Sequence, residues 1–199
     1  MPGERKPADG TPAEGRAPRA DARRNRERLL DSAVRAFTTV GLDATLDAIA
    51  KDAGVGIGTL YRHFPTRDAL IEAAYRNELT RLCDAVPELL RSAEPDAALR
   101  GWMDRYIDYM TTKSGMAAAL QAVIDSGGNP YEHSRDRLMG AIEAMLSAGV
   151  QAGTLRGDVD ATDVFAALRG VSLSAGAPHQ RDQAGRLLDL LLAGLRPLP

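Results

Sequence analysis

Residues 45–64 read TLDAIAKDAGVGIGTLYRHF, and this stretch decides the fold. Its first half predicts a short helix, because apolar residues recur there at helical spacing: Leu46, Ile49, Ala50 and Ala53. Gly54 then supplies the positive φ of a tight turn, which only glycine adopts without steric cost. A second short helix follows, with Leu60 on its buried side. Two short helices joined in this way are typical of a helix-turn-helix, whose second helix enters the major groove of DNA.

The exposed side of the second helix predicts contacts with DNA. Four of its side chains can reach phosphates or base edges: Thr59, Tyr61, Arg62 and His63. Tyr61 has an alternative place in the core, between Leu60 and Phe64. Any two short packed helices can produce this spacing, but the continuation LYRHFPTRDAL at residues 60–70 makes the pattern more specific.

Residues 45–70, with the amphipathic helix before them, resemble the DNA-binding domain of TetR/AcrR-type transcriptional regulators, most specifically at TLYRHFPTRDAL (residues 59–70). The resemblance implies that Thr45 meets a phosphate from the start of the first motif helix. It also implies that Tyr61 and His63 contact phosphates, and that Arg67, at the start of the following helix, clamps the DNA backbone.

The helix that reads DNA carries few polar side chains. Thr59 and Arg62 lie where base edges can be reached, and a guanidinium suits guanine. The chain departs from the family pattern at Gly56 and Ile57, where the family commonly has a serine and a lysine or another polar residue. Specificity is therefore expected to rest on few base contacts together with DNA shape.

Charge is distributed unevenly over the 199 residues, although the net charge is only −2. Residues 1–67 hold twelve Lys or Arg against nine Asp or Glu, whereas residues 68–199 hold thirteen against eighteen. A basic first part on an acidic body suits a protein that docks one end on DNA, although ordinary fluctuation produces such differences too.

Other function classes find little support. The three histidines, His63, His133 and His179, lack the spacing of metal ligands, so no metal and no cofactor are expected. The charges around residues 125–136 are more simply solvated than catalytic, and no enzyme is expected. A lone cysteine, Cys83, indicates packing and a reducing cytoplasm, and no apolar run is long enough to act as a signal peptide or to cross a membrane.

The domain organisation follows from helix periodicity, caps and breakers. Three residues are expected to cap helices, Thr45, Thr66 and Asp160, whereas Pro87 breaks the helical pattern and residues 131–152 predict one long helix. Residues 1–20, rich in proline, glycine and charge, predict a disordered tail. Residues 21–66 predict a three-helix DNA-binding domain, and residues 67–199 an all-α body, with about nine helices in all. The resemblance implies that this body is an effector-binding and dimerisation domain. Arginines gather where the tail meets the first helix, from Arg16 to Arg28, and an arm there could reach DNA. A solvated tail is the alternative that we favour.

The resemblance implies that the body binds a ligand and dimerises. Aromatic and thioether side chains suit an adaptable apolar pocket, although each can equally be core: Trp102, Met103, Tyr106, Met110, Leu120, Met139, Ile142 and Met145. The last two helices carry more leucine than one intramolecular contact needs, which predicts a two-fold interface through Phe165, Leu168, Leu187, Leu191 and Leu195.

The expected function is that of a homodimeric regulator that reads a pseudo-palindrome in double-stranded DNA. We expect it to act as a repressor, which is the commoner mode in the family that the chain resembles. A small, largely apolar effector is expected to release it by shifting the helix that begins at Arg67. A regulator that has no inducer, or that responds to a protein partner, is the alternative.

Overall fold

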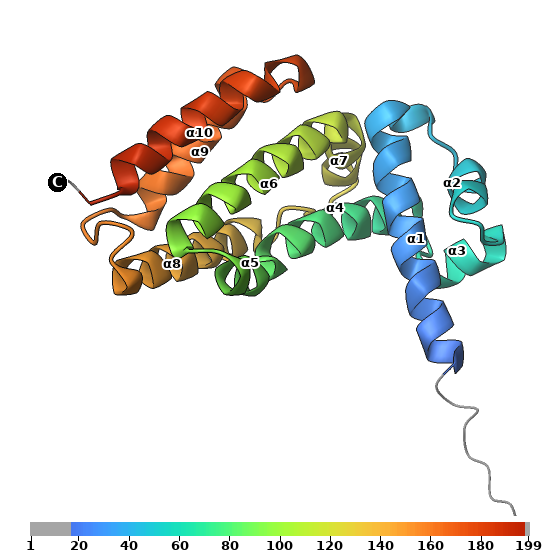
Figure 1. Cartoon of the computed structure of the whole chain (residues 1–199). Helices are drawn as coiled ribbons and strands as arrows, with labels where there is room; N and C mark the ends of the chain where they lie inside the picture. The colour runs from blue at the N-terminus through green and yellow to red at the C-terminus, as the bar shows by residue number, and fades with distance from the viewer. Residues whose placement is uncertain (1–16, 198–199) are drawn as a thin grey trace, which may run out of the picture.

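The computed structural model describes residues 17–197, and within that range the chain is all-α, as expected (Figure 1). It forms ten α-helices and two short 3-10 helices. The α-helices are α1 (Ala17–Thr39), α2 (Leu46–Asp52), α3 (Ile57–His63), α4 (Arg67–Asp84), α5 (Val86–Ser92), α6 (Pro95–Gly115), α7 (Ala117–Asp125), α8 (Ser134–Ala152), α9 (Ala161–Ala175) and α10 (Arg181–Leu195).

Helices α1, α2 and α3 pack into a small domain at one end of the molecule (Figure 1). Thr45 caps α2, since its hydroxyl oxygen accepts a hydrogen bond from the Ala48 N–H at 3.2 Å. Gly54 has φ +65° in the turn between α2 and α3, where a side chain would be strained. The buried face of α1 closes over both helices through Leu29, Leu30, Ala33 and Phe37.

Helix α4 joins this domain to the rest of the chain. Thr66 caps it, accepting a hydrogen bond from the Ala69 N–H at 3.0 Å. Helix α4 packs on α1 and also on α6, α7 and α8 of the body. It therefore connects the helix-turn-helix domain to the body through contacts with both.

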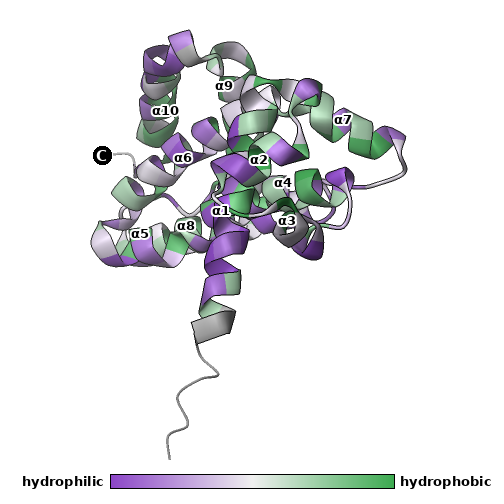
Figure 2. Cartoon of the chain, turned by 90° about the vertical axis from the view of Figure 1, so that its right-hand side faces the viewer, coloured by the Kyte–Doolittle hydropathy of each residue, from purple (hydrophilic) through white to green (hydrophobic). Residues whose placement is uncertain are grey.

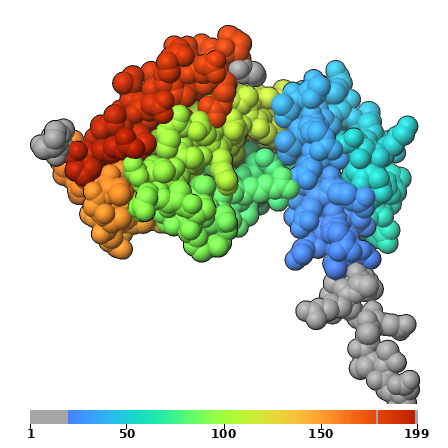
Figure 3. Space-filling view, viewed as in Figure 1, coloured from blue at the N-terminus to red at the C-terminus, as the bar shows by residue number. Residues whose placement is uncertain are grey.

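The body is built around α6, which contacts α4, α5, α8, α9 and α10. Helices α9 and α10 pack on each other and form one flank of the molecule (Figures 1 and 3). Ion pairs tie α10 to α6, among them Arg181 to Asp104 at 2.8 Å and Arg100 to Asp189 at 2.7 Å. No helix in residues 17–197 combines the length and the apolar character needed to cross a bilayer.

The structure differs from the sequence-based expectation in three places. Helix α1 begins at Ala17, so residues 17–20 are helical and not part of a tail; residues 1–16 lie outside the described range. Helix α5 was not expected, because Pro87 reads as a breaker; it lies in the first turn, where its missing N–H costs nothing. Helix α8 begins at Ser134, not Tyr131, because His133 has φ +59°.

Candidate nucleic-acid interface

The outer face of α3 is open to solvent. Tyr61 is 49% exposed and Arg62 is exposed, while Thr59 and His63 are half-buried beside them. Tyr61 therefore lies on the surface and not in the core between Leu60 and Phe64. These four of the six side chains expected to meet DNA are on one short helix, and the glycines at its start leave its backbone uncovered.

Arg62 is folded back on its own helix. Its Nε donates to the Gly58 carbonyl at 3.1 Å, and its Nη2 donates to the Thr59 hydroxyl at 3.0 Å. The two side chains expected to read bases are therefore coupled. Reaching a guanine requires Arg62 to exchange these bonds for bonds to the base.

Arg67 holds the start of α4 against the segment that leads into α2. Its guanidinium donates to the carbonyls of Leu42, at 2.8 Å, and Ala44, at 2.5 Å. The same group lies 5.0 Å from the centre of the Phe37 ring. This side chain fixes the backbone immediately before Thr45, and through it the position of the hydroxyl expected to meet a phosphate.

The arginines from Arg23 to Arg28 lie on a solvated part of α1, mostly hydrophilic in Figure 2. Arg23 pairs with Glu27, and Arg24 pairs with Asp21. Arg26 instead lies over the Phe64 ring at 5.4 Å, next to the end of α3. Arg16 lies outside the described residues.

The residues expected to line a ligand pocket lie in the body's core. Six of them are at most 1% exposed: Trp102, Met103, Tyr106, Leu120, Ile142 and Met145. The Trp102 indole donates to the Leu82 carbonyl at 3.0 Å, and its ring stacks on Tyr106. Met110 and Met139 are half-buried and reach the edge of this core.

The residues expected at a dimer interface are divided between the core and the surface. Leu168 and Leu195 are buried within the protomer, and Phe165 is 9% exposed. Leu187 and Leu191 are half-buried on α10. The most exposed large apolar side chains on these helices are two others, Leu173 at 82% and Leu190 at 69%, which were not among the residues expected at the interface.

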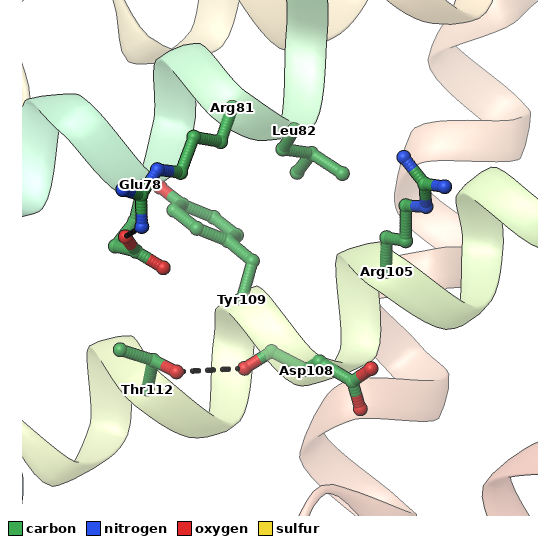
Figure 4. Close-up of a pocket in the computed structure, with 7 residues that line it drawn as sticks. All are labelled: Glu78, Arg81, Leu82, Arg105, Asp108, Tyr109 and Thr112. Atoms are coloured by element: carbon green, nitrogen blue, oxygen red, sulfur yellow. Dashed lines mark hydrogen bonds and ion pairs between the residues drawn. The ribbon is translucent and has the colours of Figure 1, made fainter. Parts of the chain in front are cut away.

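A hollow of about 230 Å³ between α4 and α6 was not anticipated from sequence (Figure 4). Its lining is mostly polar: Glu78, Arg81, Leu82, Arg105, Asp108, Tyr109 and Thr112. Arg81 also pairs with Asp31 of α1 at 2.6 Å, so the hollow adjoins a link between the two domains. Burial raises the pKa of Glu78, although Arg81 partly offsets the effect.

Metal and thiol chemistry gain no support within residues 17–197. No group of three or more His, Cys, Asp or Glu side chains in that range could hold a metal ion. Cys83 is half-buried on α4, and burial raises the pKa of its thiol. A raised pKa leaves less of the reactive thiolate, which agrees with packing as its role.

Comparisons with known proteins match both parts of the chain. Residues 29–74 match the family model "Bacterial regulatory proteins, tetR family", and residues 94–197 match "Transcriptional regulator SbtR-like, C-terminal domain". The HTH-type transcriptional regulator SrpR of Pseudomonas putida is 26% identical over 179 residues, covering 87% of this chain and 84% of SrpR.

Solved structures agree in fold and in sequence. The TetR transcriptional regulator SCO0520 from Streptomyces coelicolor has a TM-score of 0.84 and 57% identity, covering 87% of this chain and 99% of its own. A TetR regulatory protein from Mycobacterium vanbaalenii has a TM-score of 0.73 and 31% identity, and the match covers 90% of this chain and 99% of that protein. With a helix-turn-helix at one end and a matching helical body, this chain belongs to the TetR family of DNA-binding transcriptional regulators, which are not enzymes.

Proposed function

We propose that this TetR-family regulator is a homodimeric repressor that an organic ligand releases from a pseudo-palindromic operator. The observation that carries the proposal is the path of α4, which starts beside α3 and ends inside the body. The polar face of α3 reads the major groove in this proposal, and Thr45, Tyr61 and His63 contact phosphates. Arg67 acts mainly by positioning Thr45.

Dimerisation is supported by the outer surface of α9 and α10. Leu173 and Leu190 are both largely exposed on these two helices. Apolar side chains that are exposed together favour contact with a partner, whereas a single exposed leucine needs no explanation. Gly170 and Gly194, on the same two helices, have open space in front of them, so a partner helix can approach closely. A two-fold four-helix interface would cover this surface and place two copies of α3 about 34–36 Å apart.

The dimer surface is tested by charge substitution. Leu173→Glu with Leu190→Glu should convert the dimer to a monomer in sedimentation and weaken operator binding. Val150→Glu is the matched control, because Val150 is 44% exposed on α8 and lies outside this surface. A double variant that remains dimeric would contradict the assignment of this interface.

The function as a whole is tested by selecting bound duplexes from a random DNA pool at near-physiological salt. An enriched pseudo-palindrome, with half-sites one helical turn apart, is the expected result. Weak binding that depends on salt and enriches no sequence would refute specific recognition by α3. A regulator without an inducer is the second candidate, and it is favoured by the dense packing around Trp102 and Tyr106.

A further inference from the structure

Three basic side chains gather at the end of the body's aromatic core, contributed by α6, α8 and α9. Lys113 lies in the last turn of α6, with its Nζ 4.4 Å from the centre of the Tyr131 ring. Arg135, in the first turn of α8, has its Cζ 5.6 Å from the centre of the Phe165 ring. Arg169 lies one turn after Phe165 on α9.

These three cations, like Arg105 and Arg186, have no carboxylate partner within residues 17–197. None of the three forms an ion pair or donates a side-chain hydrogen bond there. On the same or neighbouring helices, Arg137 pairs with Asp84 and Arg181 pairs with Asp104 and Asp108. Those carboxylates are therefore engaged with other arginines.

Lys113 is partly buried without a carboxylate partner in residues 17–197, and the Tyr131 ring lies against its ammonium. Burial, reinforced by the positive charge of Arg169, lowers the pKa of Lys113. The contact with the ring offsets part of the cost of burying an ammonium beside a second cation, and a bound anion would offset more of it, so the site favours an anion.

The same end of the body offers an apolar surface. Met110 lies one turn before Lys113, and Met139 lies one turn after Arg135. Both are half-buried, unlike the other residues of the expected pocket, and thioethers adapt to many apolar shapes. The nearby Tyr75 hydroxyl already forms hydrogen bonds, with Tyr109 at 2.6 Å and Ser134 at 3.3 Å. Recognition of a negative charge therefore depends on the cations.

We propose that this end of the body, the Lys113 site, binds an organic carboxylate with an apolar body. The carboxylate lies between Lys113 and Arg169, and the apolar part lies against Met110 and Met139. Only the link between this binding and operator release rests on the proposed function.

The test measures thermal unfolding and binding of the full-length protein with two probe pairs, octanoate against octanamide and benzoate against benzamide. We expect at least one carboxylate to raise the melting temperature and bind saturably, and its neutral amide to do neither. Inorganic phosphate is a further arm. If neither carboxylate binds at millimolar concentration, or if phosphate is as effective as they are, the inference is overturned.

Two substitutions locate the site. Lys113→Met, which removes the charge but keeps an unbranched side chain, should weaken binding of the carboxylate about tenfold or more, as expected for one lost charge-assisted contact. Arg105→Gln is the control, since Arg105 is an exposed arginine of the same helix that lines the hollow beside α4. If Arg105→Gln abolishes binding and Lys113→Met does not, the ligand lies in that hollow and the Lys113 site is refuted.

Dimerisation offers a rival role for the same cations. If Lys113→Met dissociates the dimer and leaves binding of the carboxylate unchanged, the cations serve the interface and the inference fails. Operator binding separates the two proposals. Carboxylate binding that never releases the operator refutes the ligand switch but keeps the site, whereas normal operator binding without any carboxylate binding refutes the site alone.

Discussion

Substitution of Arg67 tests whether this residue acts on the fold or directly on DNA. Its guanidinium donates to two carbonyls, of Leu42 and Ala44, and lies over the Phe37 ring. A hydrogen bond from a charged donor contributes about 1.5–3 kcal/mol, less where solvent has access, and an exposed cation–π contact about 0.5–1 kcal/mol. Because Arg67 is half-buried, we take the low end and expect Arg67→Met to lower the free energy of unfolding by about 2–3 kcal/mol.

The assay combines urea unfolding with operator binding at several salt concentrations. A loss of about 2–3 kcal/mol corresponds to a melting temperature lower by about 4–12 °C in a chain of this size. Arg67→Lys keeps the charge but loses the planar fork that reaches both carbonyls, so it should lose most of this stability while the salt dependence stays near that of the wild type.

The opposite pattern would refute the reasoning. If Arg67→Met unfolds at the wild-type urea concentration, and its logarithmic salt slope falls by about one unit, then Arg67 is a free phosphate clamp. The carbonyl contacts would in that case contribute nothing measurable to stability.

Three further substitutions have defined outcomes. Gly115→Ala places a Cβ 2.5 Å from Thr38 Cγ2 and should lower the free energy of unfolding by about 1–3 kcal/mol, whereas Gly140→Ala, which meets open space, should be neutral or stabilising; equal effects in denaturation would contradict the close contact. Thr45→Ala removes the cap of α2 and should lower the free energy of unfolding by about 1 kcal/mol, and Thr45→Ser should restore it, with thermal unfolding as the measurement. For Glu78, a raised pKa means that the folded state holds its proton more tightly than the unfolded state. Its contribution to stability is therefore present below the unfolded pKa and lost as the pH rises through the folded pKa. The free energy of unfolding of Glu78→Gln, relative to that of the wild type, should for this reason increase from pH 4 to pH 7. If the difference does not change with pH, the carboxylate of Glu78 is not buried.

Local signals predicted most of the DNA-binding domain. The caps at Thr45 and Thr66 and the turn at Gly54 depend on neighbours within a few residues, and each is confirmed by a hydrogen bond or a φ angle. The cap at Asp160 is confirmed in the same way, since its carboxylate accepts from the Thr162 N–H at 2.7 Å. Such features can be predicted from the sequence because they depend only on the local backbone geometry and on the chemistry of one side chain.

Contacts between distant segments could not be predicted in this way. Arg67 bonds to carbonyls more than twenty residues earlier, and backbone carbonyls carry no sequence signal. The hollow beside α4 and the Lys113 site each depend on which faces of separate helices meet. Periodicity identified Trp102 and Tyr106 as inward-facing, but it does not distinguish a filled core from a cavity wall.

The end of α6 provides a route by which a ligand could act on the DNA-binding domain without first moving α4. Gly115, two residues after Lys113, approaches Thr38 in the last turn of α1 so closely that no side chain fits between them. A carboxylate at Lys113 would therefore act within one helical turn of a contact between the domains. A full switch requires a preference of about 5.5 kcal/mol between the two states, which exceeds the 1–3 kcal/mol of a typical coupling. We therefore expect one bound ligand per dimer to reduce operator occupancy partially, and two bound ligands, one in each protomer, to be needed for complete release.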